Sequence, residues 1–453
     1  MTLIHVLMPV MLAVTPADSA AAAPDTAGVL TLRAAVEKAL DNSPAVLQSQ
    51  AQRDAASAAR GETRSMRLPH VQIREIAMRT NAPADAFGLT LMQERFSLAD
   101  FSMSDPNNPD PVNNFATEFE ATWPIFVGGK VMAGVNQTRE MAAAADAGYG
   151  HTRAAIALAT ASAYMDAVLA ERSVELARRA RDTTARHVSQ AQDFFDAGMM
   201  VESDLLLARV QLAHMEENVI AADNGARIAR AHLFQMMGID QASAYTLDPD
   251  VGSIDVPSGT TEQALAGAFQ RRNDVKAAEA QLRAAEVGVK GARSGYWPEL
   301  ALIGRYSLND DKIFGANGES YALMAVARWN ILDWGQTRAQ VGGAKARYAA
   351  AEQSHRAQLQ NVEFQVRQAS LQADEARARH DVAVGAVDQA ERALHIVEDR
   401  FAQGVVRIAD VLDAETALDD ARVRELNARF DAQRALRTLA FATGLPPVPE
   451  VTQ

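Results

Sequence analysis

The 453-residue chain contains no cysteine. This absence excludes disulfides, thiolate metal sites, cysteine nucleophiles and a lipid-modified cysteine near the start of the chain. Basic charge is also scarce, because the net charge is −13 and no excess of Lys and Arg exists to neutralise nucleic-acid phosphates. The composition therefore argues against nucleic acid as a partner.

Aromatic residues make up only 6% of the chain, although 48% of its residues are apolar. Much of the apolar share is alanine, and alanine-rich, aromatic-poor sequence favours long helices over a large globular core. Beyond the N-terminus, no stretch reaches the ~18 consecutive apolar residues of a transmembrane helix. If the mature protein enters a membrane, it must do so in another way.

The N-terminus has the pattern of a secretory signal. The short apolar core "LIHVLMPVMLAV" is followed by "ADSAAAAP", which offers small-residue cleavage sites. We therefore expect a signal peptide over residues 1–23. No positive segment opens the chain, and His5 is the one basic-type side chain there, so a disordered tail or a misplaced start codon are the alternatives.

The second half of the sequence repeats the first. The segment "WPIFVGG" at 123–129 corresponds to "WNILDWG" at 329–335. The same spacing pairs Phe195 with Phe401, Gly198 with Gly404, Asp204 with Asp410, Leu206 with Leu412 and Gly238 with Gly444. One register held over so long a stretch indicates an internal duplication.

The duplication predicts a first structural repeat over 24–238 and a second over 261–444. A poorly repeated linker at 239–260 joins them, and a short tail at 445–453 follows. The first repeat also carries an insertion between Pro69 and Trp123, which contains "SDPNNPDPVNN". Such Asp, Asn and Pro clusters are typical of loops in water.

Each repeat has the same predicted order of elements. An opening helix runs to about Arg67 or Ser294 and is ended by the proline that follows. Apolar and polar residues then alternate with period two, which predicts strands over about 71–127 and 299–332, forming one hairpin in each repeat. Long helical hairpins are expected next, over about 129–237 and 335–443.

The long helices are predicted from stretches without proline, 130–195 and 336–401. At 1.5 Å per residue each would be a rod on the order of 100 Å long. Gly198 and Gly404 then turn the chain in the left-handed conformation that glycine allows. Asp204 and Asp410 fall near the starts of the return helices, where negative charge suits the helix dipole.

Four strands cannot close a barrel, and open sheet edges are not tolerated in lipid. Either the strands lie in water, or several chains pool them. Three chains would supply twelve strands, within the range of outer-membrane barrels, whereas two would supply eight, too few for a passage. Trp123, Trp297 and Trp329 at the helix-side strand ends would then form an aromatic belt at the membrane interface. The alternative is a soluble sheet with ordinary packing tryptophans.

The segment "FAQGVVRIADVLDA" at 401–414, with its counterpart "FDAGMMVESDLLLA" at 195–208, resembles the most recognisable motif of the TolC family of outer membrane efflux proteins. The duplicated order of helix, strand hairpin, long helix, glycine tip and return helix is similar to that family as well. The resemblance implies a mainly α protein with a small β part. It also implies a homotrimer with a twelve-stranded outer-membrane β-barrel continued by a periplasmic α-helical tunnel.

The resemblance further implies an exit duct in a Gram-negative outer membrane, serving tripartite efflux or type I secretion. Such a duct is a passive conduit that contacts outer-membrane lipid. It docks on a periplasmic adaptor and an inner-membrane transporter, and its periplasmic tip opens like an iris. Gly198 and Gly404 would be the adaptor-docking tips.

The resemblance also assigns a gate. Asp410 and Asp413, with Asp204, would ring the constriction at the tunnel mouth, where crowded carboxylates titrate upward or recruit cations. Phe401 stands where the family has a gating tyrosine and Val406 where it has a gating arginine, with Arg407 one residue on. We therefore expect a gate based on packing and aspartate rings; the alternative is that the aspartates form a solvated helix face.

Enzymatic motifs are absent from the sequence. "VGGKV" at 127–131 lacks the Ser or Thr of a phosphate-binding loop, and the nine histidines are scattered. We expect no enzyme activity, no cofactor and no dedicated metal site. A periplasmic helical-hairpin adaptor or scaffold without a pore is the alternative function. Such an adaptor would have one hairpin flanked by small β-domains, whereas this chain has two hairpins preceded by barrel-like strands, which favours the duct.

Overall fold

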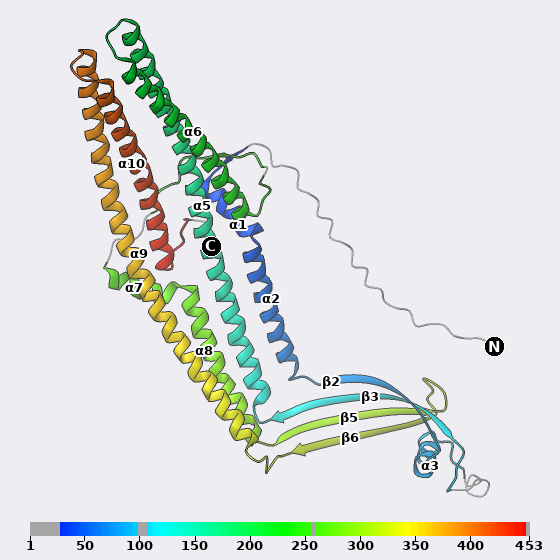
Figure 1. Cartoon of the computed structure of the whole chain (residues 1–453). Coiled ribbons are helices and arrows are strands. Elements are labelled where there is room, and N and C mark those ends of the chain that lie inside the picture. The colour runs from blue at the N-terminus through cyan, green and yellow to red at the C-terminus, as the bar shows by residue number, and fades with distance from the viewer. Residues whose placement is uncertain (1–27, 98–106, 242, 255–259, 450–453) are drawn as a thin grey trace, which may run out of the picture.

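A computed structural model describes residues 28–97, 107–241, 243–254 and 260–449. This part of the chain is elongated: a sheet lies at one end, and long helices extend from it to two neighbouring tips (Figure 1). The expected signal peptide, 1–23, and the last residues of the expected tail, 450–453, lie outside the described residues.

Two helical hairpins form the rod. The long helices α5 (Lys130–Asp196) and α9 (Gln336–Ala402) contain 67 residues each. Their return helices, α6 (Glu202–Met237) and α10 (Ile408–Ala442), contain 36 and 35. No proline interrupts either long stretch, so the backbone hydrogen bonds continue without a break.

Glycines in the left-handed region bound the long helices. Gly129 (φ +82°) and Gly335 (φ +89°) precede α5 and α9. Gly198 (φ +73°) and Gly404 (φ +71°) turn the chain at the two tips. A side chain is disfavoured at such φ values, which is why glycine stands there.

The opening helix of each half is broken in two, which corrects the expectation of one continuous run. The first half has α1 (Leu32–Asn42) and α2 (Pro44–Ser65), and the second has α7 (Thr261–Arg271), α8 (Asn273–Ala292) and a 3₁₀ turn, Arg293–Tyr296. Ser43 and Arg272 have extended backbones at the breaks. Pro44 explains the first break, because the residue before a proline avoids helical geometry.

The second break depends on tertiary contacts. Arg272 is buried, pairs with Asp274 at 2.6 Å, and donates hydrogen bonds to Gln365 Oε1 (2.7 Å) and to the carbonyl of Ala442 (3.0 Å). Arg271 donates to the carbonyl of Thr443 (3.1 Å). These contacts tie the α7–α8 junction to the end of α10.

The sheet consists of β2 (His70–Thr80), β3 (Val112–Val127), β5 (Glu299–Asp310) and β6 (Gly318–Arg328), antiparallel and in that order. The expected strand run to residue 332 is too long, because β6 ends at Arg328 and Trp329 lies beyond it. The insertion is not only a polar loop: it also contains a helix, α3 (Pro83–Met92).

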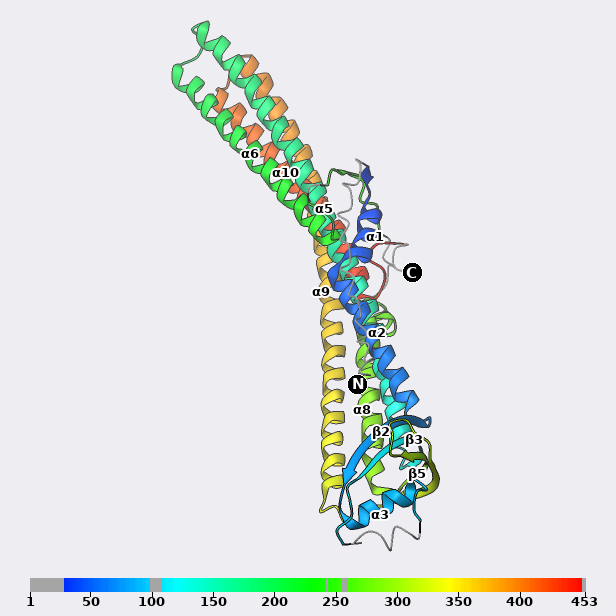
Figure 2. The ribbon, with the colours of Figure 1, turned by 90° about the vertical axis from the view of Figure 1, so that its right-hand side faces the viewer.

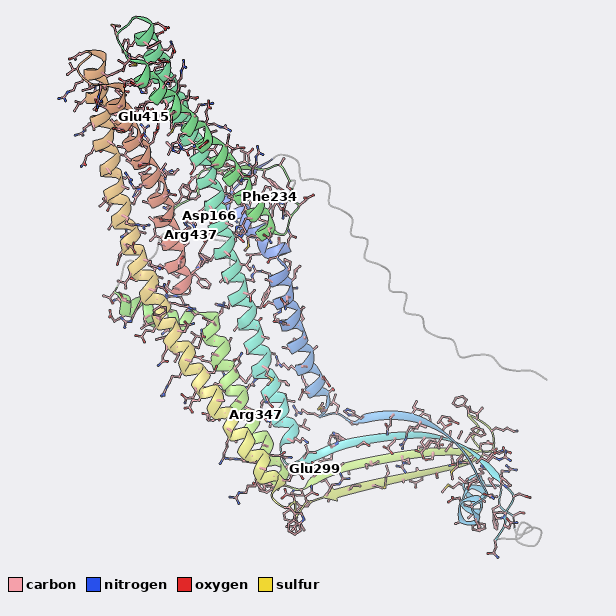
Figure 3. All side chains as sticks on the ribbon, viewed as in Figure 1. Asp166, Phe234, Glu299, Arg347, Glu415 and Arg437 are labelled. Atoms are coloured by element: carbon pink, nitrogen blue, oxygen red, sulfur yellow. The ribbon has the colours of Figure 1, made fainter. Side chains whose placement is uncertain are left out.

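The linker is tied to the rod. β4 (Thr246–Leu247) pairs in parallel with β1 (Val29–Leu30). The hydroxyl of the buried Tyr164 on α5 lies 2.6 Å from the carbonyl oxygen of Leu30 and 2.8 Å from that of Asp248. Arg437 on α10, also buried, donates to the carbonyls of Val251 and Gly252 (Figure 3).

Near the sheet the helices lie side by side in the order α2, α5, α8 and α9 (Figure 1). Toward the tips the two hairpins pack against each other, with contacts between α5 and α9 and between α6 and α10 (Figure 2). Among the described helices, α5 alone has a segment long and apolar enough to cross a membrane, and 44% of that segment is buried inside the fold. Such burial is typical of a core helix.

Candidate functional site

The two hairpins pack against each other at the tips. Phe401 is only 7% exposed, and its ring centroid lies 5.6 Å from that of Phe194 on the other hairpin. Ile408 and Val411 are buried in the same cluster, and Val406 packs partly against it. In the single chain, Phe401 and Val406 therefore hold the hairpins together, whereas Arg407 is exposed.

The structure places Asp410 and Asp413 on one exposed face of α10. The Asp410 carboxylate accepts a hydrogen bond from the backbone N–H of Arg407 (2.9 Å) and so caps the helix. Asp204 is half-buried in the first turn of α6, on the other hairpin. Within the described ranges, no three His, Cys, Asp or Glu side chains gather closely enough to hold a metal ion.

The sequence analysis missed two acidic residues of α10. Asp420 is exposed seven residues after Asp413, and that spacing keeps it on the same helix face. Glu415, by contrast, is buried at the hairpin interface near the tips (Figure 3). Burial raises the pKa of Glu415 to about 7, and the carboxylates of Asp419 and Glu398 add to the rise. The heptad spacing identifies Asp420, but nothing in the sequence alone identifies Glu415.

The tip glycines have open surroundings. A Cβ added to Gly198 or Gly404 would meet no described heavy atom within 4 Å, so only the backbone conformation requires glycine there. The next residues, Met199 and Val405, are 70% and 69% exposed. Each tip thus presents an apolar side chain to its surroundings.

The sheet has one mostly apolar face, which also carries Glu75 and Glu319, and one charged face. Ile73 on β2, Phe119 on β3 and Tyr306 on β5 lie side by side. They are exposed, and the alternation of side chains places further exposed apolar residues on this apolar face, namely Val71, Trp123, Leu302, Tyr321 and Leu323.

The charged face carries a network across three strands. Arg74 pairs with Glu118 (3.0 Å) and Glu120 (3.3 Å), and Arg305 pairs with Glu120 (2.8 Å). Gln72 also donates a hydrogen bond to Glu120 (2.9 Å). An apolar face backed by a charged one is the pattern of a barrel wall between lipid and water.

The three predicted interface tryptophans lie where the sheet meets the helices. Trp123 donates its indole N–H to the carbonyl of Arg67 (3.1 Å), and Trp329 donates to that of Tyr296 (3.3 Å). Trp297 is 61% exposed. A fourth, Trp334, is 89% exposed at φ +52°, where the first repeat has Gly128 at φ +61°. Aligning the two repeats pairs Trp334 with Gly128, and this difference is the sequence signal that could have identified Trp334.

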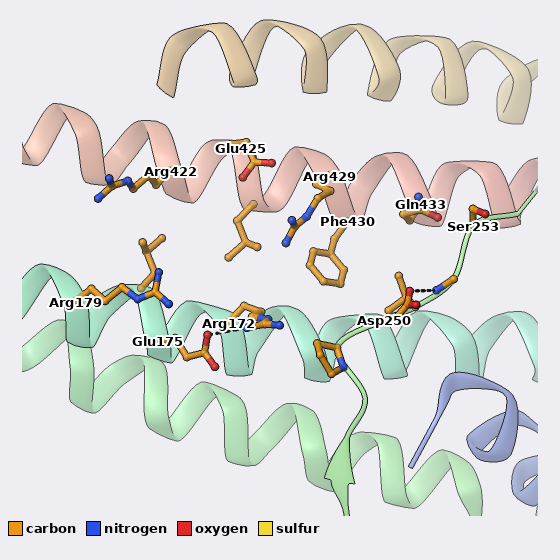
Figure 4. A pocket seen from close by; sticks show the side chains of 15 residues that line it. Arg172, Glu175, Arg179, Asp250, Ser253, Arg422, Glu425, Arg429, Phe430 and Gln433 are labelled. Atoms are coloured by element: carbon orange, nitrogen blue, oxygen red, sulfur yellow. Dashed lines mark hydrogen bonds and ion pairs between the residues drawn. The ribbon is translucent and has the colours of Figure 1, made fainter. Parts of the chain in front are cut away.

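A groove of about 610 Å³ lies between α5, α10 and the linker (Figure 4). Two of the arginines that line it are paired, Arg172 with Glu175 (2.9 Å) and Arg422 with Glu391 (2.9 Å), and Arg179 and Arg429 line it as well. The linker itself is held by a hydrogen bond from Gly252 N–H to the Asp250 carboxylate (2.9 Å). The groove therefore lies where the linker packs against the rod.

A long helical rod joined to a sheet with one mostly apolar and one charged face is typical of channel proteins of the outer membrane. The profile of the outer membrane efflux protein family matches residues 35–239 and 264–445. The chain belongs to that family.

The chain is similar to curated relatives over 70% to 91% of its length. It is 24% identical to outer membrane protein TolC of Vibrio cholerae over 90% of this chain and 89% of that protein. It is 25% identical to protein CyaE of Bordetella pertussis over 91% and 83%. It is also 27% identical to the cobalt-zinc-cadmium resistance protein CzcC of Cupriavidus metallidurans over 70% and 74%.

Solved structures share the fold. A membrane protein from Pseudomonas aeruginosa aligns with a TM-score of 0.79 at 21% identity, covering 91% of this chain and 92% of that one. The outer membrane protein VceC of Vibrio cholerae aligns with a TM-score of 0.75 at 20% identity, covering 92% and 97%.

The function of the chain follows from its family. It is an outer-membrane exit duct of tripartite efflux systems, located in the outer membrane and extending into the periplasm. Its relatives are channel proteins rather than enzymes. This assignment favours the duct over the pore-free adaptor or scaffold that the sequence left as an alternative.

Proposed function

We propose that three copies of the chain assemble into one twelve-stranded barrel continued by a helical tunnel. The observation that carries this proposal is the pair of open sheet edges: within the described residues, no strand pairs with the outer side of β2 or of β6. Open edges are not tolerated in lipid. Joining β6 of one copy to β2 of the next closes the ring.

The helices support the same closure. Near the sheet α9 lies at one side of the rod and α2 at the other, and toward the tips α6 packs mainly on α5. α9 exposes apolar side chains such as Leu371 (71%) and Val382 (74%), and α6 exposes Val210 (68%) and Ile220 (71%). Neighbouring copies would cover these side chains where α9 of one meets α2 and α6 of the next.

The faces of the sheet give the orientation of the barrel. Strands of 11 to 16 residues are long enough to cross a membrane at a tilt. The apolar face would contact outer-membrane lipid, and the Arg74–Glu120–Arg305 network would line the lumen. The tryptophans at the helix side of the sheet would then lie at the periplasmic interface.

At the opposite end, the tips would dock on a periplasmic adaptor, which couples the duct to an inner-membrane transporter. The exposed apolar residues beside Gly198 and Gly404 support this contact. Asp204, Asp410 and Asp413, each present three times, would form the acidic mouth of a passive conduit. Packing around Phe401 and Val406 would hold that mouth closed, with Arg407 exposed beside it.

The mass of the full-length protein in detergent tests the assembly. We expect a stable particle of three chains, because a single chain leaves both sheet edges open. Channel activity of the same particle in planar bilayers tests the duct. A stable monomer would contradict the proposal, as would a trimer that remains without conductance when Phe401→Ala loosens the packing at the mouth.

A further inference from the structure

Helix α3 folds back onto the outer end of the sheet, the end farthest from the long helices (Figure 1). Ala86 and Leu89 on α3 are buried, and the adjoining Gln93 is only 1% exposed. The Gln93 amide donates to the carbonyl of Asn113 (2.8 Å) and to the side chain of Asn114 (2.9 Å). The helix is thus anchored to the first residues of β3.

Three observations place α3 on the charged face. Asn114 is separated from Glu118 and Glu120 by even numbers of residues, so the three side chains share a face. The Asn114 amide donates to Asn309 across the sheet (3.1 Å). Gly318, the partner of Asn309 on β6, lies so close to the end of α3 that an added Cβ would overlap the Met92 carbonyl oxygen.

The other side of α3 is apolar. Each residue of a helix advances by about 100°, so Leu91 points away from the side that holds Ala86, Leu89 and Gln93. Leu91 is 46% exposed, and Phe87, which is 44% exposed, stacks edge-on against Phe96 at 5.1 Å. An apolar surface therefore turns away from the charged face of the sheet.

We propose that α3 lies inside the barrel and forms an apolar restriction at its extracellular mouth. This inference rests on the proposed trimeric barrel, in which the charged face lines the lumen. A helix is about 10 Å across with its side chains. A helix on the inner wall therefore reduces the radius of the barrel lumen at that height by about the same amount. Three copies would place Leu91 and Phe87 around the axis, and an apolar ring resists the passage of hydrated ions.

Cysteine labelling tests the position of α3, because the parent chain contains no cysteine. Leu91→Cys in the full-length protein is reacted with a cationic methanethiosulfonate reagent while single channels are recorded in planar bilayers. We expect labelling to change the conductance by about twofold, because the added charge enters the restriction. Leu323→Cys is the matched control: this leucine lies on the apolar face and is 82% exposed, so its labelling leaves the conductance unchanged.

A second variant releases the helix. Gly318→Ala displaces the end of α3 and is expected to raise the conductance by about twofold. Gly304→Ala is its control, since the new Cβ would meet Leu323 Cδ2 at 3.4 Å, an ordinary contact. Conductance that is insensitive to labelling at Leu91 would overturn the restriction while leaving the barrel intact. A stable monomer in detergent would instead overturn the barrel, and the restriction with it.

Discussion

The imidazole Nε2 of His187 on α5 lies 3.6 Å from the carboxylate Oε2 of Glu415 on α10. Both side chains are largely buried where the two hairpins meet, and neither of these atoms has a hydrogen-bond partner among the described residues. Burial lowers the pKa of His187 and raises that of Glu415 to about 7. Burial also raises the pKa of the neighbouring Asp419. The hairpin contact near the tips therefore responds to pH.

The first prediction concerns stability between pH 4.5 and about pH 7. The folded protein binds the Glu415 proton more tightly than the unfolded chain, whose pKa is near 4.5. The resulting stabilisation is complete below 4.5 and is lost as the pH rises through about 7. Glu415→Gln removes this loss, so its Tm in detergent should rise relative to the parent as the pH increases.

His187→Gln is the control, because its effect on stability should change with pH in the opposite direction. Because the pKa of His187 is lowered from 6.5, its contribution is lost as the pH falls below that value. The variant should therefore gain stability relative to the parent on the acidic side. Both variants keep Arg186, Glu398 and Asp419, the other charged groups around the pair. Parallel pH profiles of the parent and Glu415→Gln would contradict this account.

The second prediction concerns the acidic face of α10. If Asp410 and Asp413 line the mouth, a trivalent cation added on the periplasmic side should block single channels in planar bilayers. Changing both to Asn should weaken that block by about tenfold, because the negative potential at the mouth is reduced. The fold should survive, since the amide oxygen of Asn can accept the same Arg407 N–H bond and exposed substitutions usually alter stability by only about 0.5 kcal/mol.

Glu262→Gln is the matched control, because it removes a carboxylate from the first turn of α7, on a helix away from the tips. It should leave the block unchanged. Asp420→Asn, on the same face as Asp413, should weaken the block further when added to the double variant. If the double variant is blocked as tightly as the parent, the two aspartates form a solvated helix face and not the pore lining.

The third prediction concerns the tip at Gly404. Gly404→Ala should lower stability by roughly 1–2 kcal/mol, from the backbone strain of its positive φ alone. Export should persist in that variant. Gly404→Trp carries the same strain and adds bulk at the proposed docking contact, so trimers should reach the membrane without supporting export. Export by Gly404→Trp at the parental rate would show that the adaptor docks elsewhere.

The fourth prediction concerns Trp334. Its φ of +52° is strained for a side chain, whereas the equivalent Gly128 adopts +61° freely. Trp334→Gly should therefore raise the free energy of unfolding in detergent by about 1 kcal/mol and weaken anchoring at the membrane interface. Trp297→Gly is the control, because Trp297 has an ordinary φ of −105° and should only lose stability. A loss of stability in both variants would rule out strain at Trp334.

Local sequence determined the rod and the strands. Proline-free stretches produce α5 and α9, because only an uninterrupted series of N–H donors sustains a helix of 67 residues. Gly198 and Gly404 fix the turns, because few other residues accept a positive φ. Period-two alternation located the strands, because side chains on a strand point to opposite faces in turn.

Three features depend on tertiary contacts: the break between α7 and α8, the packing of α3 and the burial of Glu415. Nothing near Arg272 in the sequence breaks a helix; the break depends on the carbonyl of Ala442, far away in the chain. The sequence of the insertion predicted a polar loop. The insertion also contains α3, which packs on the sheet because the Gln93 amide donates a hydrogen bond to the Asn114 side chain. Glu415 lies buried beside His187, and nothing in the sequence around it specifies that position. Burial and pairing are set by which helices meet, and the period of a single helix does not specify its neighbours.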